Sequence, residues 1–426
     1  MQRVLFVHNE YQIRGGEDTV VDNEVALLRA HGHEVIEYRR SNLEYKDAGK
    51  LGMFSVAKNT IFNRKVYKEI LALIREKHVD VVHVHNTFNV ISPSVYYAAK
   101  KAGVPVVQTI HNFRFFCINA LMYRDGKPCE LCANRALKPG IQHKCYHDSK
   151  LQSMLCAYTL WHHRRKGIYS YPKYIALTDF GKEKFCQAMK DYVKPEQVTV
   201  LPNFVADERE EAEKLLQDLP TKDSAEQKSV GEKIENWHLK RNEYYVCVSR
   251  LDATKGVKLL VEQWPAGEKY PLVICGDGPL REELTAYISE RGYLPGENKH
   301  IWLLGNVPHD QALAYIKGAK ALIFPSLLYE GFPMTIAEAA MLGTPVIAND
   351  IGNGAALVRQ MSPDTVIRLA DGFTQTANET EGATKSTSIL DRDLKSEYGD
   401  IYRKWYEEHI TADAHYDALM RIYDNQ

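Results

Sequence analysis

The sequence predicts an α/β protein built from two doubly wound parallel sheets, and three observations favour this class. Short apolar runs alternate with stretches of helical spacing along most of the 426 residues, as strands and crossover helices do. This alternation occurs twice, before and after a charge-dense segment at residues 207–240. Hydrophobic residues make up 45% of the chain, so substantial cores can be buried. We therefore expect two Rossmann-like domains.

The first half is expected to hold six strands joined mainly by helices. The apolar runs that predict strands lie at residues 3–7, 34–38, 81–85, 105–111, 174–178 and 198–203. Helical spacing occurs between them at residues 19–31, 66–78 and 93–102. These elements define an N-terminal domain over residues 1–206, followed by a charged linker or helical segment at residues 207–242.

The second half repeats the pattern over residues 243–408. Its strands are expected at residues 244–249, 271–275, 301–304, 321–325 and 344–348, with a helix at residues 333–343. Residues 374–388 are rich in Thr, Ser, Gly and Asn and predict a surface loop. Two helices follow at residues 391–409 and 413–423, and the aspartates of Asp391-Arg392-Asp393 are interpreted as caps of the first. The last helix carries one apolar face, formed by Tyr416, Leu419, Met420 and Tyr423.

Composition and charge argue against several classes of function. The net charge is −1 and the pI is about 7.0, so there is no global attraction to nucleic acid or to anionic membranes. No apolar run approaches the roughly 18 residues that span a bilayer. The N-terminal run Val4-Leu5-Phe6-Val7 ends at His8, so we interpret it as a buried strand and not as a signal peptide. A cytoplasmic protein is expected.

Two glutamates astride a proline-initiated helix are the clearest indication of chemistry. Glu330 and Glu338 flank Gly331-Phe332-Pro333-Met334-Thr335, and proline favours the first position of a helix. Glu330 would lie in the loop facing the helix N-terminus, and Glu338 about a turn and a half inside, roughly 7 to 8 Å further along the axis. That distance suits a diphosphate with a polyhydroxylated group at each end. The alternative is a pair of surface glutamates on an ordinary helix.

The start of this helix would also supply donors to an anion. The first amides of a helix lack intrahelical partners, and the helix dipole favours negative charge there. The amides expected to meet the phosphates are those of Gly331, Phe332, Met334 and Thr335. The small residues Ala337, Ala339 and Ala340 on the same helix favour this reading over the surface alternative.

The segment from Tyr329 to Ala348 resembles the signature of the retaining GT-B glycosyltransferases of family 4, in which two glutamates frame a nucleotide-sugar donor. The resemblance implies that Glu330 contacts the transferred sugar and that Glu338 contacts the ribose hydroxyls. It also implies two Rossmann-like domains facing across a cleft, with a terminal helix at residues 409–426 that crosses back to the N-terminal domain. The implied reaction is a front-face displacement from a nucleoside diphosphate sugar, the co-substrate.

Further residues at the strand ends of the second half match this family. Ligands of open α/β sheets bind beyond the carboxyl ends of the strands. Arg250 and Lys255 follow one strand and could neutralise a departing nucleoside diphosphate, so no catalytic metal is expected. A solvated basic loop is the alternative. By the same resemblance, Gly276 would shape the nucleotide pocket, and the backbone of Asn306 and Val307 would read the base.

In the first half, a glycine pair and a histidine occupy strand ends. Gly15 and Gly16 stand where a helix begins, and the resemblance implies that their loop closes over the donor; a plain turn is the alternative. His111 ends a strand and corresponds to the family's active-site histidine, which would hydrogen-bond the transferred sugar or steady charge at the anomeric carbon. One turn departs from the family, because Gly352-Asn353-Gly354-Ala355-Ala356 lacks the glutamate commonly found there.

Four of the eight cysteines fall in an irregular segment at residues 113–149, at Cys117, Cys129, Cys132 and Cys145. A Cys-x-x-Cys pair flanked by two more thiols could supply four tetrahedral ligands to a structural zinc, with His143 or His147 as a substitute ligand. Four separately packed thiols are the alternative. From residue 114 to residue 173 the chain is also rich in Lys and Arg, which could meet an anionic bilayer or a lipid diphosphate carrier, or be plain solvated surface.

We therefore expect a cytoplasmic retaining glycosyltransferase that could associate peripherally with the inner face of the membrane. It would move a sugar from a UDP- or GDP-type donor to a glycan or lipid-linked glycan in surface polysaccharide biosynthesis, without binding nucleic acid. The alternatives are another GT-B class, such as a sugar-nucleotide epimerase or a phosphorylase, and a non-catalytic nucleotide-sugar or zinc-binding scaffold. The joint presence of Glu330, Glu338, Arg250, Lys255 and His111 favours the enzyme over the scaffold.

Overall fold

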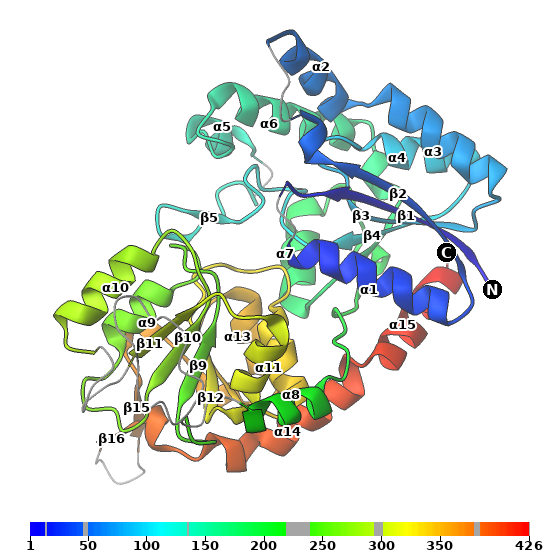
Figure 1. Ribbon diagram of the computed structural model, residues 1–426. Coiled ribbons are helices and arrows are strands. Elements are labelled where there is room, and N and C mark those ends of the chain that lie inside the picture. Colours follow the sequence, from blue (N-terminus) through cyan, green and yellow to red (C-terminus); the bar gives the residue numbers. More distant parts are fainter. Residues whose placement is uncertain are drawn as a thin grey trace. The chain divides into compact units, whose positions relative to one another are not determined.

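The chain is divided between two parallel six-stranded sheets, each with its own helices (Figure 1). The computed structural model describes residues 1–12, 15–45, 50–133, 136–218, 239–293, 301–378 and 384–425. Unit 1 comprises Met1–Arg124, Pro128–Asn203 and Ala412–Gln426, and unit 2 comprises Asp125–Lys127 and Phe204–Thr411. Both sheets belong to the doubly wound class, so the prediction of two Rossmann-like halves is confirmed.

Unit 1 has the strand order β2-β1-β3-β4-β7-β8, and every pairing in it is parallel. The strands are β1 Arg3–Glu10, β2 Glu34–Ser41, β3 Val81–Asn86, β4 Val106–Ile110, β7 Lys173–Ala176 and β8 Val198–Val200, with a small hairpin of β5 Tyr123–Arg124 and β6 Lys127–Pro128. The helices are α1 Gly16–Ala30, α2 Lys50–Ile61, α3 Arg64–Glu76, α4 Ser94–Ala102, α5 Lys138–Gln142, α6 Lys150–Arg165, α7 Asp179–Met189 and α15 Ala412–Asp424. Short 3-10 turns occupy Asn42–Tyr45, Ile168–Ser170 and Pro195–Gln197. The order reverses between β1 and β3, which makes their carboxyl ends the switch point of this sheet.

The C-terminal helix α15 packs onto the sheet of unit 1. Leu419 and Tyr423 are buried against Phe6 of β1 and Val81 of β3, and Tyr416 and Met420 pack beside them. The four residues occupy one face because they recur at helical spacing. The apolar face expected for the last helix is therefore confirmed.

Unit 2 has the strand order β11-β10-β9-β12-β13-β14, again all parallel. The strands are β9 Tyr245–Val248, β10 Leu272–Cys275, β11 Ile301–Gly305, β12 Ala321–Phe324, β13 Val346–Asn349 and β14 Val366–Ile367. The helices are α8 Arg209–Asp218, α9 Val257–Gln263, α10 Arg281–Glu290, α11 His309–Gly318, α12 Met334–Leu342, α13 Gly352–Val358 and α14 Leu394–His409, with 3-10 turns at Pro363–Thr365, Leu369–Asp371 and Ile389–Asp391. The order reverses between β9 and β12, so the switch point of unit 2 lies there.

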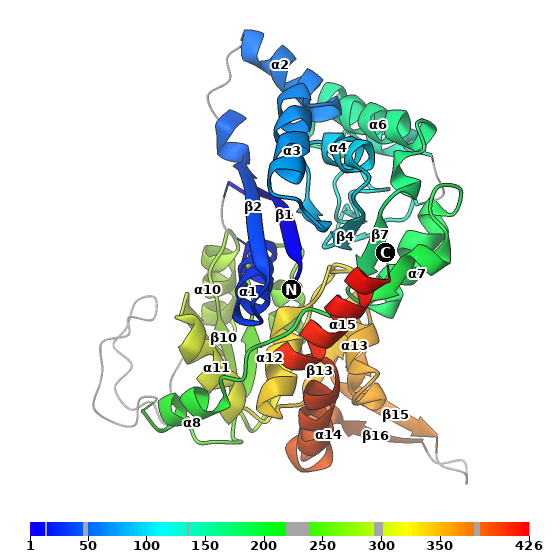
Figure 2. The same cartoon turned by 90° about the vertical axis from the view of Figure 1, so that its right-hand side faces the viewer.

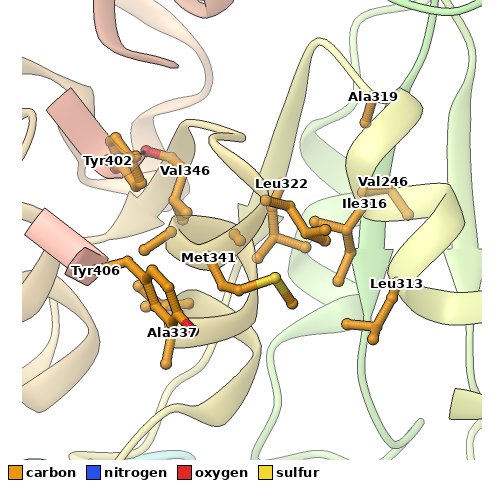
Figure 3. Packing of buried hydrophobic residues seen from close by; sticks show 14 of the residues in the cluster. Val246, Leu313, Ile316, Ala319, Leu322, Ala337, Met341, Val346, Tyr402 and Tyr406 are labelled. Atoms are coloured by element: carbon orange, nitrogen blue, oxygen red, sulfur yellow. Dashed lines mark hydrogen bonds between the residues drawn. The ribbon is translucent and has the colours of Figure 1, made fainter. Parts of the chain in front are cut away.

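Helix α12 is held in unit 2 by a tightly packed core (Figure 3). Ala337 and Met341 of α12 lie in one buried cluster with Leu322 of β12 and with Tyr402 and Tyr406 of α14. The small alanines of α12 let neighbouring elements approach closely, and Gly343 ends the helix in the left-handed conformation. This packing fixes the position of the helix that carries Glu338.

Several expectations differ from the structure in detail. Pro333 is the N-cap of α12 and not its first helical residue. Residues 374–388 contain the antiparallel strands β15 Thr374–Asn378 and β16 Thr384–Ser388 in place of the expected loop (Figure 2). Threonine favours strands, which accounts for the difference. Residues 379–383 lie outside the described part. The start of the expected linker is the packed helix α8, whose Ala212 is buried in unit 2, and residues 219–238 lie outside the described part. Asp393 caps α14 by accepting from the amide of Ser396, as expected.

Helix α6 of unit 1 lies in the basic segment at residues 114–173 and was not predicted as a helix. The cations of this segment were expected at the surface, but Arg164 is buried, and its guanidinium donates to the carbonyl of Phe115. Among the described residues no helix is both long and apolar enough to cross a membrane.

Candidate functional site

At the switch point of unit 2, the loops that follow β9 and β12 are held against each other. The amide of Leu327 donates to the carbonyl of Thr254 over 2.9 Å. Gly256, which has a φ of +71°, lies so near β12 that a Cβ atom would fall 1.9 Å from the carbonyl oxygen of Pro325. Only glycine fits this approach. The contact brings the residues after β9 next to those after β12.

Lys255 and Glu330 meet across these loops. The Lys255 ammonium donates to both carboxylate oxygens of Glu330, over 2.8 and 3.0 Å, and the Ser326 hydroxyl donates to the same carboxylate over 2.6 Å. The Glu330 side chain is only 13% exposed, so its charge is held in a partly desolvated place. Its backbone has a φ of +52°, a left-handed conformation that non-glycine residues seldom adopt. The predicted sugar-binding glutamate is thus locked to one of the two predicted cations.

Helix α12 begins directly after this glutamate. Among the described residues, the amides of Gly331, Phe332 and Thr335 have no hydrogen-bond acceptor, which leaves them available to an anion. The side chains of Phe332 and Met334 pack against the core of unit 2, and Pro333 is buried, so these positions offer backbone and not side chains to a ligand.

Glu338 lies on the fifth position of α12 and is half-buried. Its carboxylate makes no hydrogen bond or ion pair with any residue in the described part of the chain. Burial raises its pKa, an effect that His309 opposes and Glu208 reinforces. A half-buried carboxylate without a donor is a ready acceptor for hydroxyl groups.

The second predicted cation, Arg250, has a different environment. Its side chain is 69% exposed, and its guanidinium donates to Asp252, a residue that the sequence analysis did not single out. Asp252 also accepts from the amide and the hydroxyl of Thr254. Burial acts to raise the pKa of Asp252, but the hydrogen bonds from Thr254 and Arg250 hold it below its usual value. Each cation of the loop is therefore matched by a carboxylate.

The turns after β10 and β11 complete the rim of the switch point. Gly276 approaches the β9 loop so closely that a Cβ atom would lie 1.9 Å from the carbonyl oxygen of Ser249. Its amide donates to the carbonyl of Gly305 over 2.7 Å. Asn306 is exposed beside this pair, whereas Val307 packs against the core and offers only its backbone. The guanidinium of Arg281, which the sequence analysis missed, lies against Gly305 and is anchored by Asp277 over 2.8 Å.

Asn353 is a third residue of the site that was not predicted from the sequence. Its side-chain amide donates to the carbonyls of Glu330 and Gly331, over 2.7 and 2.9 Å, and so supports the strained loop. The preceding Gly352 has a φ of +58°, and a Cβ atom there would lie 2.4 Å from the Cα atom of Tyr329. The turn that lacks the expected glutamate thus buttresses Glu330. The position of Asn353 between Gly352 and Gly354 was the sequence pattern that could have indicated its role.

In unit 1, Gly15 and Gly16 begin α1 near the end of β1. Gly15 is the N-cap, its amide donates to Asp18 over 2.8 Å, and Asp18 in turn contacts Nε2 of His8 over 2.8 Å. Neither glycine has a positive φ, and nothing lies within 4 Å of a Cβ atom built on either. These glycines therefore leave open space at the start of the helix, as a ligand-binding loop requires.

His111 follows β4 and lines a cavity of unit 1. Its Nε2 atom lies 2.9 Å from Nδ1 of His85 on β3. The cavity is also lined by Phe88 and Arg114, and the Arg114 guanidinium stacks 4.3 Å from the centre of the Phe88 ring. Burial lowers the pKa of His111 to about 3, so its imidazole is neutral at physiological pH.

The four predicted zinc ligands line one small cavity of unit 1. Cys117, Cys129, Cys132 and Cys145 all border it. Burial raises the pKa of Cys117 and that of Cys132, the latter to about 11, as expected for thiols without a bound cation.

The sulfur atoms are nevertheless more widely spaced than zinc ligands. In the described part of the chain, the only group of three or more Cys, His, Asp or Glu ligand atoms within 4.8 Å of one another is Glu24, His83 and His85. The cysteines share a cavity, but their sulfur atoms would have to move closer together to bind one tetrahedral ion.

Comparison with known proteins agrees with this architecture. A family model described as Glycosyltransferase Family 4 matches residues 14–209, and one described as Glycosyl transferases group 1 matches residues 231–370. The crystal structure of Anabaena HepE in complex with UDP matches all of both chains with a TM-score of 0.59 at 15% identity, a likeness of fold.

Relatives of similar sequence are glycosyltransferases by name. The D-rhamnosyltransferase WbpZ of Pseudomonas aeruginosa is 31% identical over 31% of this chain and 33% of its own. The UDP-Gal:alpha-D-GlcNAc-diphosphoundecaprenol alpha-1,3-galactosyltransferase of Escherichia coli is 26% identical over 70% of this chain and 65% of its own. The chain therefore spans between 33% and 65% of the length of these two curated relatives. With a family model on each unit and this fold, the chain belongs to the GT-B glycosyltransferases of glycosyltransferase family 4.

Proposed function

We propose that this protein is a retaining glycosyltransferase that moves a sugar from a UDP- or GDP-type donor to a glycan or lipid-linked glycan acceptor in surface polysaccharide biosynthesis. The observation that carries the proposal is the contact of Lys255 with Glu330 at the switch point of unit 2, where α12 begins. The names of the two relatives support it, since one is a rhamnosyltransferase and the other a galactosyltransferase acting on a diphosphoundecaprenol acceptor.

The nucleoside diphosphate would lie over the start of α12. Its phosphates would accept from the amides of Gly331, Phe332 and Thr335, where the helix dipole favours negative charge. Glu338 would accept from the ribose hydroxyls, because its position on α12 is about 6 Å along the axis from the first residue. Glu330 would accept from hydroxyls of the transferred sugar.

The leaving diphosphate would be stabilised by Arg250 and Lys255, so we expect no catalytic metal. Both cations are held by carboxylates, Asp252 and Glu330, which keep them oriented beside the helix start. Preorganised charge of this kind lowers the barrier without a reorganisation cost. Arg250 is 69% exposed, so its guanidinium is accessible to a phosphate while it remains paired with Asp252.

Unit 1 would bind the acceptor through the cavity beside His111. The aromatic ring of Phe88 suits the apolar face of a sugar, and Arg114 suits an anionic group such as a lipid diphosphate. His111 would hydrogen-bond the transferred sugar, and the loop of Gly15 and Gly16 would approach the donor.

Helix α6 would give unit 1 a peripheral contact with an anionic membrane. Leu151, Met154, Tyr158 and Trp161 recur at helical spacing, and each is at least 47% exposed. The buried face of α6 mixes the polar residues Ser153, Thr159 and His163 with Cys156, Ala157 and Leu160, so apolar side chains lie on both faces of this helix. Exposed aromatic and aliphatic side chains with a basic end favour the interface of a bilayer.

Vesicle flotation tests this contact. Wild type should float with vesicles containing an anionic lipid, and the variant with Tyr158→Ser and Trp161→Ser should float less. Ile401→Ser, at another exposed apolar position on α14, is the matched control. Equal flotation of all three proteins would contradict the membrane contact.

The cysteine cavity would hold a structural zinc in unit 1. Four thiolates satisfy a tetrahedral ion completely, so this metal would order the loop and not take part in transfer. The ion would reverse the effect of burial on these thiols by favouring their thiolate forms.

The decisive experiment is a donor screen. Purified protein is offered UDP-, GDP- and ADP-sugars, with and without lipid-linked glycan acceptors, and the released nucleoside diphosphate is measured. Acceptor-dependent release from one donor class, with a glycosylated product, supports the proposal. Interconversion of the sugar without an acceptor would instead identify an epimerase, and no release from any donor would contradict transferase activity.

A further inference from the structure

A chain of buried titratable groups lies behind His111 in unit 1. Glu24 of α1, His83 and His85 of β3, and His415 of α15 are all at most 4% exposed. The Glu24 carboxylate lies 3.5 Å from Nε2 of His85, 3.7 Å from Nδ1 of His83 and 3.3 Å from Nε2 of His415. The roles proposed for the donor and acceptor do not use Glu24, so its burial needs another explanation.

These groups are more easily understood as a hydrogen-bond network than as a metal site. Both ring nitrogens of His83 already have partners, the hydroxyls of Tyr423 and Thr109, over 2.6 and 2.8 Å. A metal would have to displace one of them. The Oε2 atom of Glu24 and the Nε2 atom of His85 have no hydrogen-bond partner within the described residues, and they lie 3.5 Å apart.

Glu24 presents an acceptor to His85 wherever the nearby proton resides. Nδ1 of His415 lies 2.9 Å from the carbonyl of Pro202, which only accepts, so this nitrogen carries hydrogen. A proton between Nε2 of His415 and Oε1 of Glu24 can then sit on either atom. In both cases Oε2 of Glu24 remains an acceptor, and this oxygen, 3.5 Å away, favours hydrogen over a lone pair on Nε2 of His85.

This arrangement determines the state of His111. A neutral imidazole has one donor and one acceptor nitrogen, and burial lowers the pKa of both His85 and His111, so both are neutral. With hydrogen on its Nε2 atom, His85 can only accept at Nδ1. The donor over the 2.9 Å contact is therefore Nε2 of His111, and Nδ1 of His111 keeps a lone pair.

We propose that Glu24 acts through His85 as a positioning residue, which fixes His111 in the tautomer whose Nδ1 atom accepts a hydrogen bond from a ligand hydroxyl. Nδ1 of His111 has no hydrogen-bond partner within the described residues, so it is open to such a ligand. Without an acceptor at Glu24, His85 could reverse and turn His111 into a donor. The identification of the hydroxyl as that of a sugar rests on the proposed function. The tautomer of His111 is inferred from its contacts alone and does not rest on that function.

Nitrogen NMR of protein labelled with ¹⁵N-histidine tests the tautomer directly. The His111 signals are identified by their loss in His111→Gln. In wild type we expect hydrogen on Nε2 and none on Nδ1, and in Glu24→Leu, which leaves His85 without the carboxylate acceptor, we expect hydrogen to appear on Nδ1. Asp80→Asn is the control, since Asp80 pairs with Arg3 in the same unit and should leave His111 unchanged.

Kinetics supply a second readout once a donor is known. Glu24→Leu should lower kcat by about 10- to 100-fold, the effect of one misdirected hydrogen bond at a reacting group, with little change in the KM for the donor. Hydrogen on Nδ1 of His111 in wild type, or an unchanged tautomer in folded Glu24→Leu, would overturn the proposal. If that variant does not fold, the wild-type tautomer decides alone. The NMR result needs no turnover, so its failure is distinct from failure of the proposed function.

Discussion

Exchanging Glu330 for glutamine should separate turnover from nucleotide affinity. The Glu330 carboxylate holds the Lys255 ammonium over 2.8 Å, and removing its charge leaves Lys255 free to meet a diphosphate. We therefore expect Glu330→Gln to bind a free nucleoside diphosphate at least as tightly as wild type. Its turnover should fall, because the sugar loses a charge-assisted hydrogen bond of about 1.5 to 3 kcal/mol, roughly a 10- to 150-fold decrease.

Glu338→Gln should behave in the opposite way. Glu338 has no donor in the described part of the chain and would meet the ribose, so its loss should weaken nucleotide binding by about the same free energy. Titration calorimetry with UDP and GDP measures affinity, and released nucleoside diphosphate measures turnover. Glu283→Gln is the control, because Glu283 forms an ion pair with Lys258 that is about half exposed on both sides. An equal loss of affinity in the Glu330 and Glu338 variants would refute this placement of the donor.

Further predictions follow from other parts of the structure. Asn353→Ala removes two hydrogen bonds to the Glu330 loop and should lower both the Tm, through a loss of about 1 to 3 kcal/mol, and turnover; an unchanged Tm would contradict it. Burial raises the pKa of Glu17 to about 7 from 4.5, so its contribution to stability is fully present below pH 4.5 and is lost as pH rises through 7. Glu17→Gln should flatten this fall in denaturant unfolding, and an unaltered pH dependence would argue against the raised pKa. Cys129→Ser combined with Cys132→Ser should lower the Tm, and elemental analysis of wild type should find about one zinc per chain. Less than about a tenth of an equivalent of zinc, together with freely alkylated thiols, would exclude the metal. Transfer should persist in EDTA, and an absolute requirement for magnesium would contradict the role of Arg250 and Lys255.

The sequence was most informative where backbone geometry limits the choice of residue. Gly256 and Gly276 stand at strand ends where a Cβ atom would collide with a neighbouring carbonyl, and Gly343 ends α12 in a left-handed conformation. Glycines of this kind mark the turns at the strand ends of a doubly wound sheet, which is where ligands bind. The fold class and the location of candidate residues could therefore be predicted.

The pairings within the site could not be predicted in the same way. Lys255 and Glu330 are 75 positions apart, and Asn353 is 23 positions from Glu330, so only the folded sheet brings them together. Arg250 was expected to neutralise the diphosphate, but its ion pair with Asp252 depends on the path of one loop. Helix α6 was missed for another reason: apolar residues such as Trp161 are exposed and polar residues such as Ser153 are buried, which weakens the usual pattern of a buried apolar stripe.

Glu330 is where the evidence for a functional site is most concentrated. A non-glycine residue in a strained region of backbone conformation costs about 1 to 3 kcal/mol, and it persists only where its surroundings hold it. Asn353 holds the backbone of Glu330 from one side, and Lys255 and Ser326 hold its carboxylate from the other. Glycine would relieve the strain but would abolish the carboxylate. A loop shaped only for stability would favour glycine at this position. The presence of glutamate despite the backbone strain therefore argues that the carboxylate itself is needed.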